Sequence, residues 1–332
     1  MIRISSLPSH PAEWAAHLTG SPAWAISAGQ LLPQSEPHKS AWLVAIGAID
    51  AALLDLLASE LAAAGLAASL YPLPDSQLPA LLIGCERFSP ELAERLRAGT
   101  WPCDVCHLAA LPTLCEPGLL VMDMDSTAIR IECIDEIARL AGVGEQVAAV
   151  TAAAMQGKLE FADSLRNRVA LLANAPVTIL DQVAAAMPWM PGLVELVGAL
   201  RKAGWKVAIA SGGFTRFAGE LQRALGLDAI FANELEMDGD HLTGRVAGRI
   251  VDAAVKAEVL TALGEQYAIP HAQRVAVGDG ANDLKMMAVA GLGIAIHAKP
   301  VVQAQAPASI KHHDLDGVLT LLQVSQAAAT RW

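Results

Sequence analysis

The order of apolar and polar positions along the chain predicts strands that alternate with helices. Short, mostly apolar runs, typical of strands buried in a parallel sheet, lie at residues 119–122, 205–210, 274–278 and 292–296. Segments that we interpret as helices lie at residues 192–202, 215–225, 252–263 and 281–289. A further strand at 229–232 precedes a hairpin whose two-residue turn we place at Asp238-Gly239. This alternation predicts an α/β fold with a doubly wound, Rossmann-like parallel sheet.

The alternation is interrupted after the first of these strands. Four helices are predicted in succession, at residues 132–140, 144–155, 160–172 and 177–187, with no strand among them. A block of helices inserted between the first two strands cannot lie in the sheet. We therefore expect a helical cap, about residues 133–190, over the carboxyl ends of the strands.

A separate pattern precedes the parallel sheet. Strands at 42–46, 67–70, 80–83 and 104–108 and helices at 50–64 and 89–98 follow the order βαββαβ. This is the split-βαβ, ferredoxin-like arrangement, and it resembles the small ACT-like regulatory domains of amino-acid enzymes. We expect an N-terminal α+β domain at residues 1–112 and a larger core domain at 113–330. A regulatory role for the first domain and a role in packing or dimerisation both stay open.

Acidic side chains follow the predicted strands where a ligand would bind. Asp123 and Asp125 come directly after the strand at 119–122, and the period of two in an extended chain turns both carboxylates to one side. Ser211-Gly212-Gly213 follows the second strand, and Asp279-Gly-Ala-Asn282-Asp283 follows the third. The carboxyl ends of parallel strands meet at one edge of the sheet, so we expect a single site there. Because clustered carboxylates repel each other, a hard cation is the expected occupant.

Composition and charge exclude several classes of protein. The 332 residues are 54% hydrophobic and 17% charged, which predicts a large core and excludes disorder. A net charge of −11 argues against nucleic acid and anionic membrane as partners. The most apolar long stretch, residues 49–70, contains three acidic residues and is not a convincing membrane span. The first eight residues lack the apolar region of a signal peptide, so a cytoplasmic location is expected.

The five cysteines fit that compartment because an odd, sparse set does not make a disulfide framework. Cys103-Asp-Val-Cys106-His107, together with Cys115, was weighed as a zinc site. A single Cys-x-x-Cys without a second pair is weak support for zinc. We interpret Cys85, Cys115 and Cys133, which lie among apolar neighbours, as small hydrophobic residues.

The motifs themselves resemble a known superfamily. Asp123-x-Asp125-x-Thr127, Ser211, Lys256 and Gly278-Asp279-x-x-Asn282-Asp283 are similar to the four motifs of the haloacid dehalogenase-like phosphatases. Residues 123–138 and 161–168 are similar, within that superfamily, to the phosphoserine phosphatase family, and the similarity covers about residues 119–322. It implies a haloacid dehalogenase core with an inserted helical cap. It also implies Mg²⁺-dependent hydrolysis of O-phosphoserine, a small phosphorylated amino acid, in the last step of serine biosynthesis. A homodimer is left open.

The resemblance also implies a role for each residue of the catalytic centre. Asp123 is the nucleophile that forms an aspartyl phosphate, and Asp125 is the general acid and then the general base. Lys256 offsets the charge of the phosphate in the transition state. Metal ligands are Asp123, the backbone carbonyl of Asp125, and Asp279. Asp283 is expected to hold these ligands in position without binding the metal itself.

Substrate recognition is implied in the same way. Ser211 and Gly212 bind the phosphate, and Asn282 matches a substrate-contacting position. Glu132 at the start of the cap matches the position that binds the ammonium group, and Arg168 matches the position that binds the carboxylate. Met155 and Phe161 correspond to apolar cap residues near the substrate, although both could be plain core. Arg166, on the same helix as Arg168, is assigned to a solvated face.

Two other functions stay open. The chain could be an amino-acid sensor whose phosphatase core is vestigial, although a vestigial core should have lost at least one motif carboxylate. It could also be a phosphatase of the same fold that acts on a different small phosphate ester.

Overall fold

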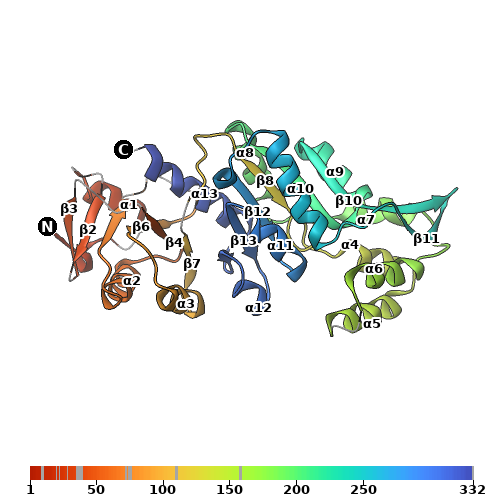
Figure 1. The fold of residues 1–332 in the computed structure, drawn as a ribbon, viewed down its shortest axis with the longest axis horizontal. Coiled ribbons are helices and arrows are strands. Elements are labelled where there is room, and N and C mark those ends of the chain that lie inside the picture. The colour runs from red at the N-terminus through yellow and green to blue at the C-terminus, as the bar shows by residue number, and fades with distance from the viewer. Residues whose placement is uncertain are drawn as a thin grey trace.

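The protein is described by a computed structural model that covers residues 1–8, 11–19, 21, 23–27, 29–34, 40–71, 73, 77–108, 111–156 and 159–330. Strands in these ranges form two seven-stranded sheets. The N-terminal sheet lies at one end of an elongated molecule, the helical cap lies at the other end, and the second sheet lies between them (Figure 1). No helix in the described ranges is both long enough and apolar enough to cross a bilayer.

The central sheet has the parallel architecture that the apolar runs predict. Its order is β11-β10-β9-β8-β12-β13-β14, and all neighbours except the β10–β11 hairpin are parallel. The strands are β8 (Leu119–Met122), β9 (Lys206–Phe214), β10 (Ala229–Asp238), β11 (His241–Ala247), β12 (Arg274–Gly278), β13 (Leu292–Ile296) and β14 (Ala308–Ile310). Successive strands are added on one side of β8 and then on the other. The chain thus changes direction next to β8, where α/β sheets bind their ligands.

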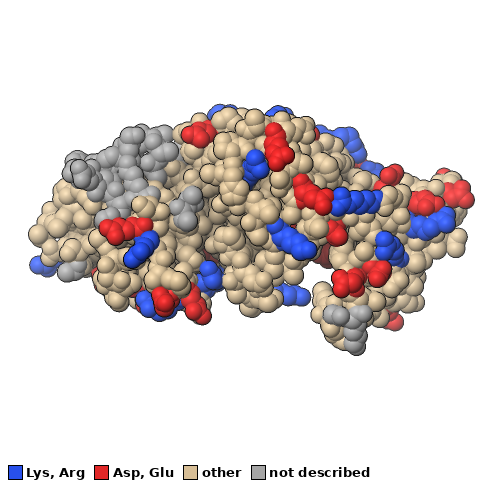
Figure 2. All heavy atoms as spheres, viewed as in Figure 1, with Lys and Arg blue, Asp and Glu red and all other residues tan. Residues whose placement is uncertain are grey.

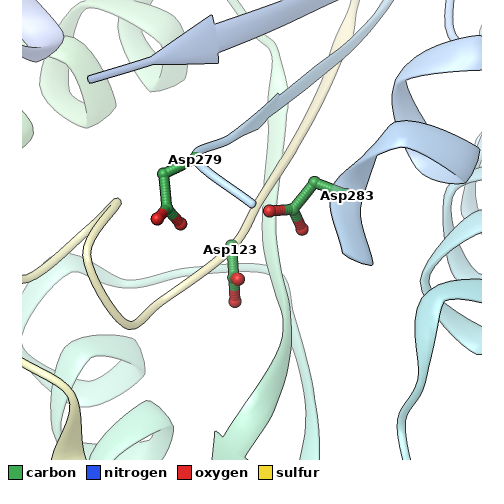
Figure 3. Close-up of side chains that lie close together, drawn as sticks. All are labelled: Asp123, Asp279 and Asp283. Atoms are coloured by element: carbon green, nitrogen blue, oxygen red, sulfur yellow. The ribbon is translucent and has the colours of Figure 1, made fainter. Parts of the chain in front are cut away.

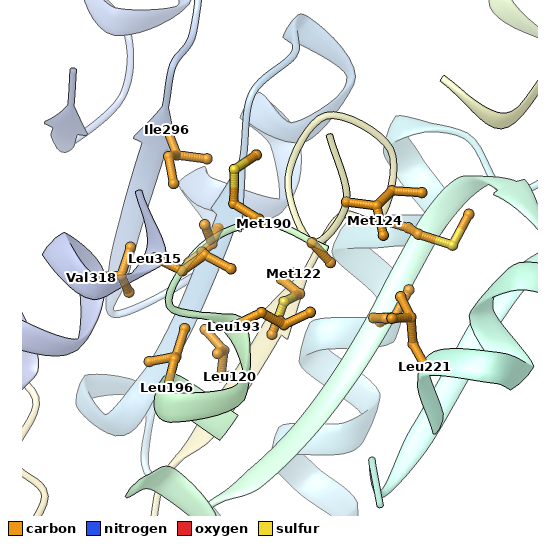
Figure 4. Packing of buried hydrophobic residues seen from close by; sticks show 14 of the residues in the cluster. Leu120, Met122, Met124, Met190, Leu193, Leu196, Leu221, Ile296, Leu315 and Val318 are labelled. Carbon is orange, nitrogen blue, oxygen red and sulfur yellow. The ribbon is translucent and has the colours of Figure 1, made fainter. Parts of the chain in front are cut away.

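Helices cover both faces of this sheet. They are α8 (Leu193–Lys202), α9 (Thr215–Leu225), α10 (Ala253–Gln266), α11 (Leu284–Ala288), α12 (Pro300–Gln303) and α13 (Leu315–Thr330). The predicted helix at 281–289 is a 3-10 turn, Ala281–Asp283, followed by the short helix α11. On one face, side chains of β8 and β13 pack against α8 and α13 (Figure 4). A second apolar cluster buries the other face under α10 and α11.

The predicted helical cap is present. It consists of α4 (Cys133–Leu140), α5 (Gly144–Met155), α6 (Phe161–Ala170) and α7 (Thr178–Ala186). The two linkers that join the cap to the core run beside each other, since Ile129 bridges Trp189 and the Arg130 amide donates to the Pro188 carbonyl at 2.9 Å. The β10–β11 hairpin reaches the far side of the cap, where backbone hydrogen bonds join Leu242 to Asn174 and Ala175.

Two predictions at strand ends need correction. We predicted that the second strand ends before Ser211, but β9 continues to Phe214 and pairs with β10 again beyond a register shift. Glycines at 212 and 213 suggested a turn, whereas the backbone remains extended through both. The hairpin turn is Gly239-Asp240 rather than Asp238-Gly239, because Asp238 and His241 face each other as the last strand pair. Gly239 supplies the positive φ, 56°, that the turn requires.

The N-terminal region contains the four strands and two helices that were predicted for it. They are β4 (Ala41–Gly47), α2 (Ala51–Ala63), β5 (Ala68–Tyr71), β6 (Ala80–Cys85), α3 (Pro90–Ala98) and β7 (Cys103–Leu108). Before them, β1 (Ile2–Arg3), α1 (Pro11–His17), β2 (Ala23–Ser27) and β3 (Gln30–Gln34) were not predicted. These strands lengthen one edge, so the antiparallel order is β1-β3-β2-β5-β6-β4-β7.

The two faces of this sheet pack against different parts of the molecule. One face is covered by α2 and α3. The other face, which includes Val44, Leu82 and Leu108, belongs to the same apolar cluster as Leu315 and Leu319 of α13. The N-terminal sheet is therefore packed directly on the core, although the domain limit near residue 112 stays a prediction.

The cysteines do not form the zinc site that was considered from the sequence. Cys103 belongs to the apolar cluster on one face of the N-terminal sheet, whereas Cys106 belongs to the cluster on the other face. Three residues apart on a strand, the two thiols point to opposite sides. Cys85 and Cys133 are buried as expected, but Cys115 is exposed, contrary to the interpretation that placed it in the core.

Candidate active site

The predicted nucleophile lies where the central strand of the parallel sheet ends. Asp123 follows β8 directly, and its amide donates to the carbonyl of Val277 on β12 at 2.9 Å. This bond holds the Asp123 backbone against the neighbouring strand. The residue is 4% exposed; its Oδ1 accepts from the Met124 amide at 2.7 Å, and its Oδ2 lies 2.7 Å from Nζ of Lys256.

Lys256 connects the nucleophile to a second carboxylate. It lies on α10, fully buried, and its Nζ also donates to Oδ1 of Asp283 at 2.8 Å. Burial alone would lower the pKa of Lys256, but the carboxylates of Asp123 and Asp283 outweigh that effect and raise the pKa. The ammonium group therefore stays charged beside Asp123. The sequence places these residues far apart, and the fold brings them together as the motifs predict.

Three carboxylates form an acidic cluster at this point. Asp123, Asp279 and Asp283 each offer an oxygen, and these atoms all lie within 4.8 Å of one another. Figure 3 shows Asp279 and Asp283 approaching Asp123 from the segment that follows β12. Thr127, which is fully buried, donates to Oδ1 of Asp279 at 3.3 Å. Burial, together with the charges of Asp123 and Asp283, raises the pKa of Asp279 to about 7.

The donor set fits a hard divalent cation. Closely spaced carboxylates raise each other's pKa because their negative charges repel, and a bound cation would balance those charges. Asp283 is the least available ligand, because its Oδ2 accepts from the Gly280 amide at 3.0 Å while its Oδ1 is held by Lys256. Gly278 has no room for a side chain, since a Cβ there would lie 2.3 Å from Asp283. Asp283 is thus held on both oxygens by partners within the protein, while its role in supporting the metal ligands stays a prediction.

Asp125 has the environment of a protonated acid. Its Oδ1 is buried without a hydrogen-bond partner among the described residues. Burial, then the charges of Glu132 and Asp123, raise the pKa of Asp125 well above its usual value. Its Oδ2 lies close to Gly213, where an added Cβ would approach it to 2.8 Å. A carboxyl group held neutral in this way can donate a proton to a leaving group.

The predicted phosphate-binding segment lies beside these acids. Ser211 is 1% exposed, and its Oγ accepts from the Gly213 amide at 3.0 Å. A Cβ on Gly212 would lie 2.7 Å from Cζ of Phe161, the first residue of α6. The cap therefore contacts the segment directly, and Phe161 is one of the side chains that close the site.

The two predicted recognition residues lie on the cap side. Glu132 precedes α4, and its Oε1 accepts from Oγ of Ser126 at 2.8 Å. Ser126 holds a left-handed backbone conformation, φ 56°, between the first motif and the cap. Burial raises the pKa of Glu132, with the Ser126 bond and Arg168 acting against the rise.

Arg168 is partly buried on α6. Its Nε donates to the Ser164 carbonyl at 3.4 Å, and among the described residues it forms no ion pair. Burial lowers the pKa of Arg168, and the charges of Asp135 and Glu132 oppose that change. Asp135 was not among the predicted site residues, although it lies within the segment 123–138 that carries the family resemblance; it is one of two acids in the first turn of α4.

The remaining predictions have mixed outcomes. Arg166 pairs with Asp163 at 3.1 Å on an exposed face, as assigned. Asn282 is partly exposed in the 3-10 turn after β12. Met155 is 71% exposed at the end of α5, so it is not core, and its sulfur lies 4.0 Å from Nζ of Lys299. Whether Asn282 and Met155 touch substrate stays a prediction.

Comparison with known proteins agrees with this geometry. A family model described as haloacid dehalogenase-like hydrolase matches residues 120–288. A phosphoserine phosphatase of Vibrio cholerae is 54% identical over 225 residues, which are 68% of this chain and 69% of that protein.

Solved structures extend the similarity beyond the central sheet. An unliganded crystal structure of a probable phosphoserine phosphatase from Vibrio cholerae has a TM-score of 0.73 and 43% identity, over 89% of this chain and 90% of the other. A structure of a phospho-aspartyl intermediate analogue of phosphoserine phosphatase has a TM-score of 0.58 and 40% identity, over 61% of this chain and 98% of the other. The chain is therefore an enzyme that belongs to the haloacid dehalogenase-like hydrolases and, within them, to the phosphoserine phosphatase family.

Proposed function

We propose that the enzyme hydrolyses O-phosphoserine to serine and inorganic phosphate through an aspartyl phosphate on Asp123. The observation that carries this proposal is the position of the Asp123 carboxylate, 2.7 Å from the buried ammonium group of Lys256 and part of the acidic cluster with Asp279. The ammonium group of Lys256 can offset negative charge at the carboxylate that attacks phosphorus and on the phosphoryl group in the transition state.

The reaction follows in two steps from the positions of Asp123 and Asp125. In the first, an Asp123 oxygen bonds to phosphorus, the bond from phosphorus to the serine oxygen breaks, and Asp125 gives its proton to that oxygen. In the second, water loses a proton to Asp125 and bonds to phosphorus while the Asp123–phosphorus bond breaks. The raised pKa of Asp125 suits both halves, since the residue is protonated at the start and at the end.

Mg²⁺ is the proposed cofactor. Asp123 and Asp279 would hold it through carboxylate oxygens, and the backbone carbonyl of Asp125 would be a third protein ligand, a set of hard oxygen donors that magnesium prefers. When bound, the ion neutralises charge on the phosphate oxygens. Lys256 and the Ser211–Gly212 segment supply the remaining positive charge and hydrogen-bond donors for the phosphate.

The cap is proposed to select the amino-acid part of the substrate. Phosphoserine carries an ammonium and a carboxylate in addition to its phosphate, and each needs a partner of opposite charge. Glu132 offers a carboxylate, and the guanidinium of Arg168, which makes no ion pair within the described ranges, offers the planar fork that binds a carboxylate through two parallel bonds. Asn282 is proposed as a further substrate contact.

The N-terminal part is proposed to be a ferredoxin-like, ACT-like domain, residues 1–112, attached to a core of residues 113–330. The order β5-β6-β4-β7 and the two helices on one face support this assignment. Its role as a regulatory or dimerising unit stays open, as does a homodimer. Placement in the last step of serine biosynthesis and in the cytoplasm is likewise a prediction. Lys and Arg are interspersed with Asp and Glu on the face drawn in Figure 2, so that face has no basic stripe for nucleic acid.

The test is phosphate release from a panel of phosphorylated metabolites, with Mg²⁺ present. We expect phosphoserine to have the highest kcat/KM of the panel. A clear preference for a phosphate ester without an amino-acid group would assign the chain to a different substrate of the same fold. No release from any ester would favour the vestigial sensor, although every motif carboxylate is in place.

A further inference from the structure

The pairing between β9 and β10 is interrupted at the proposed phosphate-binding segment. Parallel pairing runs in register from Ala208↔Ala229 to Ala210↔Phe231 and then resumes at Phe214↔Asn233. Between these points β9 contains three residues, Ser211 to Gly213, whereas β10 contains one. The two additional residues of β9 form a bulge. The segment therefore leaves the regular strand pairing and lies near the acids that follow β8. Backbone groups in the bulge lose their regular partners on β10.

The side chain of Asn233 occupies this break. Its Nδ2 donates to the carbonyl of Gly212 at 2.8 Å, and its Oδ1 accepts from the amide of Val251 at 2.8 Å. The residue is 1% exposed. One contact needs a donor and the other needs an acceptor, so an amide satisfies both and a carboxylate of the same shape does not. The two backbone partners also fix which end of the amide is nitrogen.

Each contact of Asn233 leads to a different part of the proposed phosphate site. The Gly212 carbonyl belongs to the same peptide group as the Gly213 amide, which donates to Oγ of Ser211 at 3.0 Å. With that acceptor position filled, the Ser211 hydroxyl is left to donate its own hydrogen. Fixing the Gly212 peptide therefore orients the hydroxyl toward an acceptor such as phosphate.

The second contact leads to the buried lysine. Val251 directly precedes Asp252, whose side chain caps α10 by accepting from the amides of Ala254 and Val255 at 2.9 Å. Lys256 lies one residue further along that helix. One side chain thus joins the segment that carries Ser211 to the helix that carries Lys256.

We infer that Asn233 is a positioning residue for the phosphate site, which sets the Ser211 hydroxyl and Lys256 in a fixed relation to each other. The inference rests on the proposed function, because it assumes that a phosphate group binds between these elements. Asn233 itself does not touch the reacting atoms. Its effect on turnover is exerted through the orientation of two groups, and small displacements of such groups reduce both binding and rate.

The test compares Asn233→Ala, which removes both hydrogen bonds, with Asn233→Asp, which keeps the acceptor for Val251 and removes the donor to Gly212. Binding of inorganic phosphate is measured by titration calorimetry with Mg²⁺ present, and turnover is measured with phosphoserine and with p-nitrophenyl phosphate. We expect the phosphate Kd and the KM for both esters to rise about 10- to 100-fold in each variant. Asn167→Ala, at an exposed position of α6, is the matched control and should leave these values within about twofold of the wild type.

Stability is measured on the same samples to separate positioning from a purely structural role. A structural residue would lower the unfolding midpoint but leave the phosphate Kd of the folded fraction unchanged, and that result in Asn233→Ala would overturn the inference. Should Asn233→Asp fail to fold, the alanine variant decides alone. Failure of the wild type on phosphoserine would count against the proposed substrate only, because phosphate binding and the p-nitrophenyl ester report on the phosphate site independently.

Discussion

Three buried charged residues lie at the proposed reaction centre, and their net charge explains why a metal ion would bind there. Asp123, Lys256 and Asp283 are linked by contacts of 2.7 and 2.8 Å, so two carboxylates share one ammonium group. A buried charge without a partner destabilises a fold by several kcal/mol. The set therefore carries an excess negative charge that a metal ion would offset, while Lys256 serves the nucleophile and the supporting acid together.

The first prediction concerns Asp123. Asp123→Asn keeps the shape of the side chain but replaces the nucleophilic carboxylate with a weakly nucleophilic amide, so turnover should fall by at least ~10⁴-fold. Far-UV circular dichroism should be unchanged. Acid quenching of the wild type with labelled substrate, followed by peptide mapping, should place the phosphoryl label on Asp123. A label on any other residue would contradict the assignment.

A second prediction concerns Glu132 and Arg168, which should bind the two charges that distinguish phosphoserine from a simple ester. We expect Glu132→Gln and Arg168→Ala each to reduce kcat/KM for phosphoserine by ~10²-fold or more, because the substrate charge loses its partner. Activity on p-nitrophenyl phosphate should change far less. Arg166→Ala, two residues away on the exposed face of α6, is the control and should match the wild type. Equal losses on both substrates would make these residues structural parts of the cap.

At the scale of elements, the sequence predicted well wherever one pattern dominated. The apolar runs before Asp123 and Asp279 became β8 and β12 with the predicted bounds, because a strand that is buried on both faces is apolar along nearly its whole length. The helices predicted to start at residues 50 and 89 begin one residue later, because the side chains of Asp50 and Ser89 accept from backbone amides three residues on. Such features depend on residues that are close in sequence, so distant parts of the fold do not alter them.

Predictions failed where the outcome depends on a partner distant in sequence. Glycines at 212 and 213 indicate a turn locally, yet the segment stays extended and β9 pairs with β10 again at Phe214↔Asn233. Asn233 has no motif around it, and its importance follows only from the register shift that places it opposite Phe214. The predicted strand at 229–232 ended before Asn233, whereas β10 continues to Asp238, so the sequence pattern did not mark Asn233 as a polar residue inside a strand. β1, β2 and β3 were also missed, since β1 has only two residues, a proline at position 22 directly precedes β2, and Pro33 lies within β3.

The third prediction concerns the metal, which joins the loops after β8 and β12. Chelation should abolish turnover, and added Mg²⁺ should restore it. Mg²⁺ should also stabilise the folded protein, by about 2.7 kcal/mol at 100 times its Kd, because it relieves the repulsion among Asp123, Asp279 and Asp283.

This stabilisation is measured by denaturant unfolding with and without the ion, so it does not depend on activity. Asp279→Asn should lose most of the stabilisation by Mg²⁺, whereas Asp55→Asn, on the exposed face of α2, should keep all of it. Full turnover in excess chelator, or an unfolding curve that Mg²⁺ does not move, would rule the metal site out.

At the scale of the whole molecule, the N-terminal sheet is joined to the core by more than apolar packing. Asp104 of β7 is 1% exposed and accepts from the amides of Lys311 and His312 and from Nδ1 of His313, at 2.6, 3.0 and 2.8 Å. These donors lie between β14 and α13, the helix that the sheet packs against. A single carboxylate thus fixes the segment that leads into α13. The ring of His313 leaves no space for a side chain at Gly47.

The last prediction tests this junction. Asp104→Ala leaves three donors without their acceptor at a largely buried contact, so the free energy of unfolding should fall by about 2–4 kcal/mol. Asp55→Ala, an exposed acid on the same domain, should change it by less than about 0.5 kcal/mol. Because the residues assigned to the catalytic centre all follow residue 122, kcat for folded Asp104→Ala protein should stay within about twofold of the wild type. Denaturant unfolding, followed by tryptophan fluorescence, gives the first value, and a steady-state assay gives the second. Equal stability of the two variants would show that apolar packing alone holds the sheet to the core, while a large loss of kcat would show that the junction acts on the active site itself.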